Sequence, residues 1–224
     1  MQIRFWGVRG SIPAPLSPTQ IQSKITAAIQ RITLKDIESV DSKQRFLSSL
    51  PSWIFGTIGG NTSCVGYKNS VDTHIIFDAG TGIRGLGKTF DKSVNNEIHL
   101  LLSHYHWEHI QGLPFFDPIY WPNTTMHIYS PDESAPFFLR EQMKQPFYPV
   151  QYDTAFTKNI IYHKIEPGIK FFINSTEISC KKMSHPGSSY SYSVYENGKK
   201  FIYATDVELN ATDRLCEGMI NKPI

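Results

Sequence analysis

A group of histidines directly after an apolar run constrains this chain more than any other part of its sequence. Residues 97–103, EIHLLLS, form a nearly continuous apolar run, which is typical of a β-strand that is covered on both faces. The next six residues include His104, His106, Glu108 and His109. Side chains two positions apart at a strand end can point to one side, and the following turn can bring the last two residues to the same place. The segment therefore predicts imidazoles and a carboxylate clustered at the end of a buried strand.

Such a cluster has the chemistry of a metal site. Neutral imidazoles and carboxylates are ligands of zinc, manganese and iron. The alternative is an exposed polar turn, which poorly explains three histidines and a carboxylate within six residues. The pattern is neither HExxH nor HxxEH, because position 105 is tyrosine. We expect one or two divalent ions, with zinc as the first choice and manganese or iron as alternatives.

Two later residues fit as further ligands. His185 lies in the turn SHPG after an expected strand, and Asp206 ends the run FIYATD. Taken singly, His185 is equally well explained as a turn residue, and Asp206 as the cap of a following helix. Their positions at strand ends, in this order after the first cluster, favour a ligand role for both.

The alternation of apolar and polar residues predicts a strand-rich chain with helices between the blocks, which is a layered α/β architecture. Strands are expected at 2–6, 63–67, 74–77, 97–103, 126–130, 160–164, 170–173, 176–183, 190–195 and 200–204, and helices at 18–31, 44–50, 83–90 and from about 109. We interpret 1–224 as a single domain with a helical insertion at about 16–58. This insertion is expected to pack on the main domain, either shaping the rim of a cleft or forming a cap without a role in the chemistry.

Composition excludes several other classes of protein. The 22 basic and 20 acidic residues give a net charge of +2, which argues against a nucleic-acid coat or a polybasic membrane tether. No apolar run approaches about 18 residues, so no membrane span is expected. The three cysteines, Cys64, Cys180 and Cys216, are far apart, which is typical of a reducing compartment. Because the first residues also lack the pattern of a signal peptide, we predict a cytoplasmic protein.

Several segments, in this order, resemble the metallo-β-lactamase fold family, and specifically its phosphodiesterase-like branch with cyclic phosphodiesterases and ribonuclease Z. They are FWGVRGSIP (5–13), GGNTSC (59–64), FDAGTG (77–82), LLSHYHWEHIQGLPFF (101–116), SHPG (184–187) and YATD (203–206). The resemblance spans nearly the whole chain apart from 16–58. It implies a four-layer αββα sandwich and a hydrolase that uses a metal-activated water.

The resemblance also implies a role for each site residue. His104, His106 and His185 would hold a first ion, Glu108 and His109 would contribute to a second, and Asp206 would bridge both. Asp206 and Glu108 are the expected catalytic carboxylates. Asp78 matches an aspartate that orients a ligand histidine through its distal N–H; a turn aspartate that bonds to its own loop is the alternative.

Two departures from the family pattern bear on the second ion. The family has aspartate where this chain has Glu108, and its pattern continues after Asp206 to a further histidine. Here the last histidine is His185. We therefore expect the C-terminal closing strands and that ligand to be lacking.

These features predict a phosphodiesterase that acts on a small phosphodiester or a nucleotide, with RNA as a further substrate. The alternative is a catalytically impaired metal-binding or interaction protein of the same fold; a lactone or thiolester hydrolase would use the same ligands. Arg9 and Arg84 are candidate phosphate contacts, although surface ion pairs explain them better. Trp107 could line the pocket or pack against its neighbours, and packing is the expected role. An open sheet edge would favour a homodimer.

Overall fold

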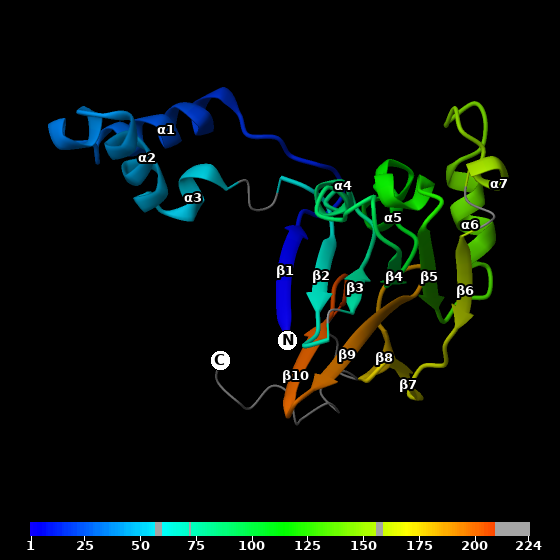
Figure 1. Cartoon of the computed structure of the whole chain (residues 1–224). Coiled ribbons are helices and arrows are strands. Elements are labelled where there is room, and N and C mark those ends of the chain that lie inside the picture. Colours follow the sequence, from blue (N-terminus) through cyan, green and yellow to red (C-terminus); the bar gives the residue numbers. More distant parts are fainter. Residues whose placement is uncertain (57–59, 72, 156–158, 209–224) are drawn as a thin grey trace.

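Two β-sheets packed face to face form the body of the protein (Figure 1). The structure, a computed structural model, describes residues 1–56, 60–71, 73–155 and 159–208. The first sheet has the order β1-β2-β3-β4-β5-β6, and the second has the order β10-β9-β8-β7. The strands are β1 Gln2–Gly7, β2 Cys64–Lys68, β3 His74–Phe77, β4 Asn96–Leu101, β5 Thr124–Ser130, β6 Ile160–Lys164, β7 Lys170–Ile173, β8 Thr176–Met183, β9 Ser189–Glu196 and β10 Lys199–Tyr203.

Helices cover the outer face of the six-stranded sheet. In the body these are α4 Ile83–Gly87, α5 Trp107–Ile110, α6 Ala135–Gln142 and α7 Tyr152–Ala155, with the 3-10 turns η2 Leu113–Phe115 and η3 Asp117–Tyr120. One apolar core lies between these helices and the sheet and includes Ile98, Leu100 and Leu139. A second core lies between the two sheets and includes Leu101, Tyr192 and Val194. Three layers of the expected four-layer sandwich are therefore present in the described residues. The closing strands that we expected to be lacking would follow Asp206, and residues 209–224 lie outside this description.

Strand direction brings the ends of several strands to one edge of the sandwich. In the first sheet β3, β4, β5 and β6 are parallel. In the second sheet β8 and β10 each pair antiparallel with β9, so they run in the same direction as each other. Loops that follow β3, β4, β8 and β10 carry Asp78, the 104–109 segment, His185 and Asp206. The topology thus gathers residues that are far apart in the sequence.

The expected strands agree with the observed ones to within two residues at each end, and the predicted α/β fold class is confirmed. Helix α5 begins at Trp107, two residues earlier than expected. Helices α6 and α7 were not anticipated. Among the described residues, no helix combines the length and the apolar character needed to cross a membrane.

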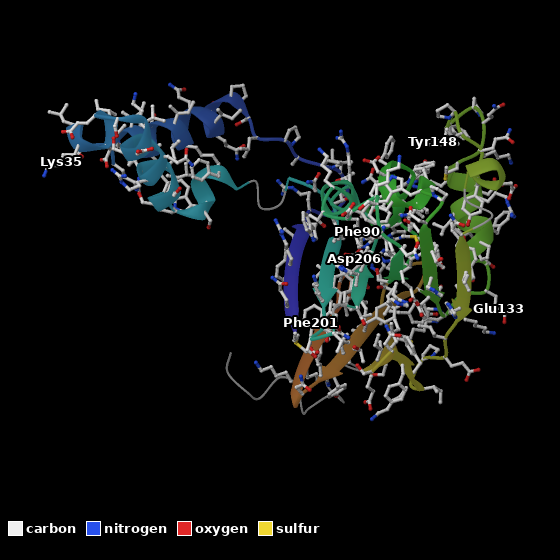
Figure 2. The ribbon with its side chains drawn as sticks, viewed as in Figure 1. Lys35, Phe90, Glu133, Tyr148, Phe201 and Asp206 are labelled. Atoms are coloured by element: carbon white, nitrogen blue, oxygen red, sulfur yellow. The ribbon has the colours of Figure 1, made fainter. Side chains whose placement is uncertain are left out.

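The segment between β1 and β2 forms a helical arm that projects from the body (Figure 1). It consists of α1 Pro18–Ile29, η1 Leu34–Ile37, α2 Val40–Ser49 and α3 Ser52–Phe55. Helix α1 packs against α3, and η1 packs against α2. None of the four makes an extensive contact with the described sandwich, and Lys35 stands at the far end of the arm from Asp206 (Figure 2). We expected this segment to pack on the main domain, and the arm instead contacts mainly itself.

The arm contributes no residue to either core of the sandwich, so its removal should leave the body stable. We predict that replacing residues 18–55 by a flexible Gly-Ser linker shifts the melting temperature by less than about 3 °C. The control is Leu100→Ala, which removes a fully buried side chain of the body and should cost about 2–5 kcal/mol. Thermal unfolding followed by circular dichroism measures both. A decrease in melting temperature in the linker variant as large as that in Leu100→Ala would show that the arm stabilises the body.

Candidate metal centre

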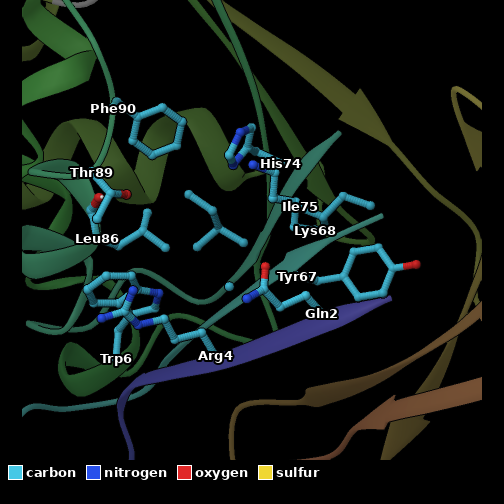
Figure 3. Close-up of a pocket in the computed structure, with 12 residues that line it drawn as sticks. Gln2, Arg4, Trp6, Tyr67, Lys68, His74, Ile75, Leu86, Thr89 and Phe90 are labelled. Carbon is cyan, nitrogen blue, oxygen red and sulfur yellow. Dashed lines mark hydrogen bonds between the residues drawn. The ribbon is translucent and has the colours of Figure 1, made fainter. Parts of the chain in front are cut away.

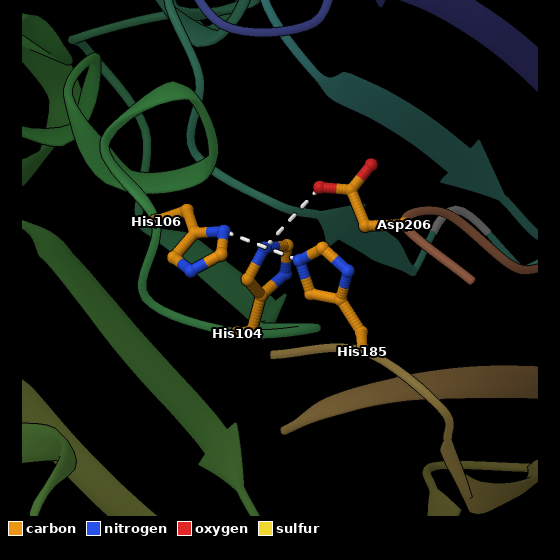
Figure 4. Close-up of side chains that lie close together, drawn as sticks. All are labelled: His104, His106, His185 and Asp206. Carbon is orange, nitrogen blue, oxygen red and sulfur yellow. Dashed lines mark hydrogen bonds and ion pairs between the residues drawn. The ribbon is translucent and has the colours of Figure 1, made fainter. Parts of the chain in front are cut away.

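Three segments, which follow β4, β8 and β10, bring six nitrogen or oxygen donors together at one edge of the sandwich (Figure 4 shows four of these residues). The donors form two groups that share one carboxylate. The first group is His104, His106, His185 and Asp206, and the second is Glu108, His109 and Asp206. Within each group all donor atoms lie within 4.8 Å of one another. All six residues that the sequence pointed to are thus brought together.

Close backbone packing fixes the 104–109 segment against the loop that follows β3. The N–H of Ala79 donates to the carbonyl of His109 over 2.7 Å, and the N–H of Gly112 donates to the carbonyl of Ala79 over 2.8 Å. A side chain at Gly80 would lie 2.3 Å from the carbonyl oxygen of Glu108, and one at Gly112 would lie 2.1 Å from the carbonyl oxygen of Gly80. Only glycine permits this approach. The glycines of 78–82 and the glycine after α5 therefore place His109 beside Asp78.

Asp78 is fully buried and accepts four hydrogen bonds from three segments. Its Oδ1 accepts from the N–H of Ser103 over 2.7 Å. Its Oδ2 accepts from Ser103 Oγ, from Tyr203 Oη and from His109 Nδ1, each over 2.7 Å. The backbone of Asp78 has φ 58°, a left-handed conformation that aspartate tolerates better than most residues. This carboxylate joins the ends of β3, β4 and β10.

These hydrogen bonds fix which nitrogen of each buried imidazole carries a proton. His109 Nδ1 donates to Asp78, and Nε2 is left facing Asp206 Oδ2 at 2.8 Å. Ser103 Oγ already donates to Asp78, so it accepts from His104 Nδ1 over 3.0 Å. His104 Nε2 is then also left facing Asp206 Oδ2, at 3.2 Å. Two nitrogen lone pairs therefore face one carboxylate oxygen, and this contact requires a positive charge between them.

His104 Nε2 shows that a cation fits this place. The atom is buried and makes no hydrogen bond, although the carboxylate is near. His106 Nδ1 lies 3.2 Å from His185 Nε2, and the His104 and His106 rings are 4.5 Å apart. Ring nitrogens crowded in this way repel one another when protonated and are stabilised when they share an ion. The donor set, imidazole nitrogens and carboxylate oxygens, suits zinc, manganese or iron.

The charge states of the buried groups agree with this interpretation. Burial, together with the neighbouring His109, lowers the pKa of His104 to about 4, so His104 is neutral at pH 7. Burial alone would lower the pKa of His109, but the hydrogen bond and charge of Asp78, helped by Asp206, outweigh it and raise the pKa. Burial would raise the pKa of Asp206, yet the facing imidazoles of His109 and His104 lower it. The carboxylates of the centre thus favour a positive charge beside His109, which a proton on Nε2 supplies below the raised pKa and a bound ion can supply in its place.

Glu108 is positioned by the loop that follows β1. Its Oε1 accepts a hydrogen bond from the N–H of Ser11 over 3.2 Å. Ser11 has φ 61°, and the loop around it is joined to Asn61 by the N–H groups of Val8 and Arg9. The longer side chain of glutamate still reaches the second group, where its donor oxygen lies near His109 and Asp206.

The environments of several residues near the centre differ from those expected from the sequence, or were not expected at all. Trp107 was expected to pack, and this expectation is wrong, because 63% of it is exposed beside His106. Arg9 and Arg84 are both exposed. The roles of Ser103 and Tyr203 as donors to Asp78 were missed, although both residues stand in segments that carry the resemblance.

A separate pocket of about 220 Å³ lies beside α4 and strands β1 to β3 (Figure 3). Arg4, Trp6, His74 and Phe90 are among its lining residues, and none of the six donors is. This pocket is therefore distinct from the centre.

Replacing Asp78 tests how far the centre depends on this one carboxylate. We predict that Asp78→Asn lowers the free energy of unfolding by about 2–4 kcal/mol, because buried donors lose their charged acceptor. Asparagine keeps the left-handed backbone accessible, so the effect reports on hydrogen bonds and charge. Zinc affinity should fall about 10–100-fold, as expected when a group that orients a ligand is removed. Chemical denaturation measures the free energy of unfolding, and zinc titration measures the affinity. The control is Asp91→Asn, which changes an exposed aspartate. Equal stability and equal zinc affinity in the two variants would contradict this role of Asp78.

Zinc binding should also depend on pH through His109. Because the pKa of His109 is raised, its imidazole keeps a proton to higher pH, and an ion must displace that proton. We predict that the affinity of the Glu108, His109 and Asp206 group falls as the pH is lowered through the raised pKa of His109, and that the fall approaches about tenfold per pH unit for one competing proton. In Asp78→Asn the pKa of His109 loses the part of the upward shift that Asp78 causes, so the fall should begin at lower pH. Calorimetric titrations at several pH values measure it, and an affinity independent of pH would contradict the assignment.

Three solved structures have a similar fold. They are the metallo-beta-lactamase fold protein YhfI from Bacillus subtilis (17% identity, TM-score 0.50, 68% of this chain and 58% of that chain), Zn(2+)-bound PqqB from Methylobacterium extorquens (14%, 0.54, 91% and 62%) and the short form of human tRNase Z (16%, 0.53, 92% and 69%). The chain spans 58–69% of the length of these proteins. At this level of identity the likeness concerns the fold, and it confirms the predicted fold of metallo-β-lactamase type.

Comparison of sequences gives a narrower relationship. No curated protein matches the chain. The family model of the Anti-Pycsar protein Apyc1 matches residues 63–220, which is more than half of the chain and excludes the helical arm. The chain therefore belongs to the Anti-Pycsar protein Apyc1 family.

Proposed function

We propose that this chain is a metal-dependent hydrolase, and specifically a phosphodiesterase. The observation that carries the proposal is the pair of donor groups that share Asp206. A shared carboxylate between two groups of donors is suited to two neighbouring cations. When bound, such ions supply an ionised water near neutral pH and neutralise the charge of a phosphodiester and its leaving oxygen.

The residues of the chain prepare this chemistry by holding the donors in place before any ion arrives. Asp78 and Ser103 fix the rings of His109 and His104 and leave each Nε2 free to coordinate. Ser11 restrains Glu108, and the hydroxyl of Thr205 donates to Asp206 Oδ1 over 3.2 Å. A site whose ligands are held in this way loses little conformational entropy when it binds an ion.

Two further observations support a phosphodiester substrate. Trp107 presents an exposed indole next to His106, and a flat aromatic surface of this kind can stack on a nucleotide base. Among proteins of similar fold, tRNase Z acts on tRNA by its name, and PqqB is described as zinc-bound. We therefore propose a small phosphodiester or a nucleotide as substrate, with RNA as a further one, and zinc as the ion. A cytoplasmic location and a homodimer stay predictions.

Hydrolysis of bis(p-nitrophenyl) phosphate tests the proposal. We predict that chelator-treated protein is inactive and that zinc or manganese restores turnover. His106→Ala should lower kcat/KM at least about a hundredfold, because it removes a donor from the first group. The control is His74→Ala, which changes a histidine outside the centre and should leave turnover within about twofold.

Absence of turnover in folded, metal-loaded protein would contradict the phosphodiesterase proposal and favour the alternative of a metal-binding or interaction protein. Turnover of lactones or thiolesters, without that of phosphodiesters, would keep the centre and change the substrate class.

A further inference from the structure

A second group of histidines lies on three neighbouring strands, on the face of the sheet that is turned toward the four-stranded sheet. His99 in β4 is paired in register with His127 in β5, and Tyr129 is paired with His163 in β6. Side chains alternate along a strand, so His99 shares a face with Leu101, which belongs to the core between the sheets. This face is otherwise apolar at the same level, where Ile75 of β3 is paired with His99.

Glu97 lies two residues before His99 and shares its face of β4. Its Oε1 is 3.7 Å from His99 Nε2 and 3.5 Å from His127 Nε2. In a tetrahedral zinc site with bonds of about 2.0–2.2 Å, the ligand atoms are separated by roughly 3.4 Å. The carboxylate is therefore at the spacing from both imidazoles that two ligands of one ion adopt.

The far nitrogen of each ring already has a partner. His99 Nδ1 contacts Tyr129 Oη over 3.1 Å, and His127 Nδ1 contacts His163 Nε2 over 2.8 Å. Histidines that bind a metal commonly donate their other N–H to such a partner, which fixes the ring and the tautomer. With both Nδ1 atoms acting as donors, each Nε2 carries a lone pair and is free to coordinate.

His99 Nε2 is the observation that points to a missing ligand. The side chain of His99 is 5% exposed, and its Nε2 is buried without a hydrogen bond. An unsatisfied buried polar atom destabilises the fold. Burial, with the neighbouring His127 and His163, lowers the pKa of His99 to about 4, so a proton does not satisfy this atom at neutral pH.

We propose that Glu97, His99 and His127 bind a divalent cation of the zinc type and thereby join β4 to β5, apart from the main centre. An ion can enter through the cavity of about 300 Å³ that Glu97 and His99 line together with Asn95, Asn96 and Asn174, and this cavity has room for a water as fourth ligand. The cluster is more open than the main centre, because its three donor atoms do not all lie within 4.8 Å of one another. Its two rings are stacked with centroids 4.9 Å apart, so binding tilts them toward each other while the exposed Glu97 closes on the ion.

The experiment uses the full chain with the main centre disabled by His106→Ala and Asp206→Ala, so that only other sites take up zinc. We expect about one equivalent of zinc to bind in calorimetry and to raise the melting temperature. Adding Glu97→Gln should weaken this binding at least about tenfold and abolish the shift. Glu97 is 61% exposed, so its replacement does not threaten folding. Glu141→Gln, which changes another exposed carboxylate, should leave the binding as it was.

His127→Gln separates coordination from simple attraction to a negative charge. If zinc is held only by the charge of Glu97, binding persists in this variant, and the proposal is wrong. Loss of binding in both Glu97→Gln and His127→Gln, with an anomalous zinc peak between Glu97, His99 and His127, supports it. Absence of zinc uptake in the folded background overturns it and leaves the three histidines as a buried polar cluster. Because no turnover is measured, these outcomes are independent of the phosphodiesterase proposal.

Discussion

The buried carboxylate of Asp78 is the interaction on which the metal centre depends. It is fully buried, and its hydrogen-bond donors come from three other parts of the chain, namely the residues just after β4, the helix α5 and the end of β10. A buried charge is stable only when hydrogen bonds satisfy it, so these segments must meet if the chain is to fold in this way. The same contacts that stabilise Asp78 orient His109 and, through Ser103, His104. Folding and preparation of the centre are therefore one process.

Most of the fold could be predicted from the sequence because period-two alternation and apolar runs are local signals. The strands at 74–77, 160–164, 170–173 and 176–183 have the expected bounds. The six donors could be identified because four of them lie within six residues and the other two follow strands. The six donors lie together because β4, β8 and β10 end at one edge of the sandwich. This arrangement was expected from the resemblance to the family, since no local sequence pattern indicates it.

The features that were missed depend on contacts between distant residues. Ser103 and Tyr203 lie in segments that resemble the family, but the sequence does not show which acceptor their hydroxyl groups bind. That acceptor, Asp78, becomes evident only in the folded structure. Helix α6 contains Pro136 and two adjacent phenylalanines, which obscure a helical period, although Leu139 is fully buried. The helical period of Ile21, Ile25 and Ile29 was correctly seen, but periodicity does not say what covers an apolar face. In the structure these side chains remain 46–62% exposed on the arm.

Strand β4 connects the two histidine clusters, and comparing them shows what makes a strong site. His104 follows the strand end, where loops from both sheets can surround it, and two carboxylates, the buried Asp78 and the partly buried Asp206, face its group. His99 lies within the strand, where neighbouring backbones are fixed by the ladder and only side chains can adjust. Its carboxylate, Glu97, is largely exposed, so water screens its charge. The same residue types would therefore hold an ion firmly at the strand end and, at the proposed site on the sheet face, more weakly and with easier exchange.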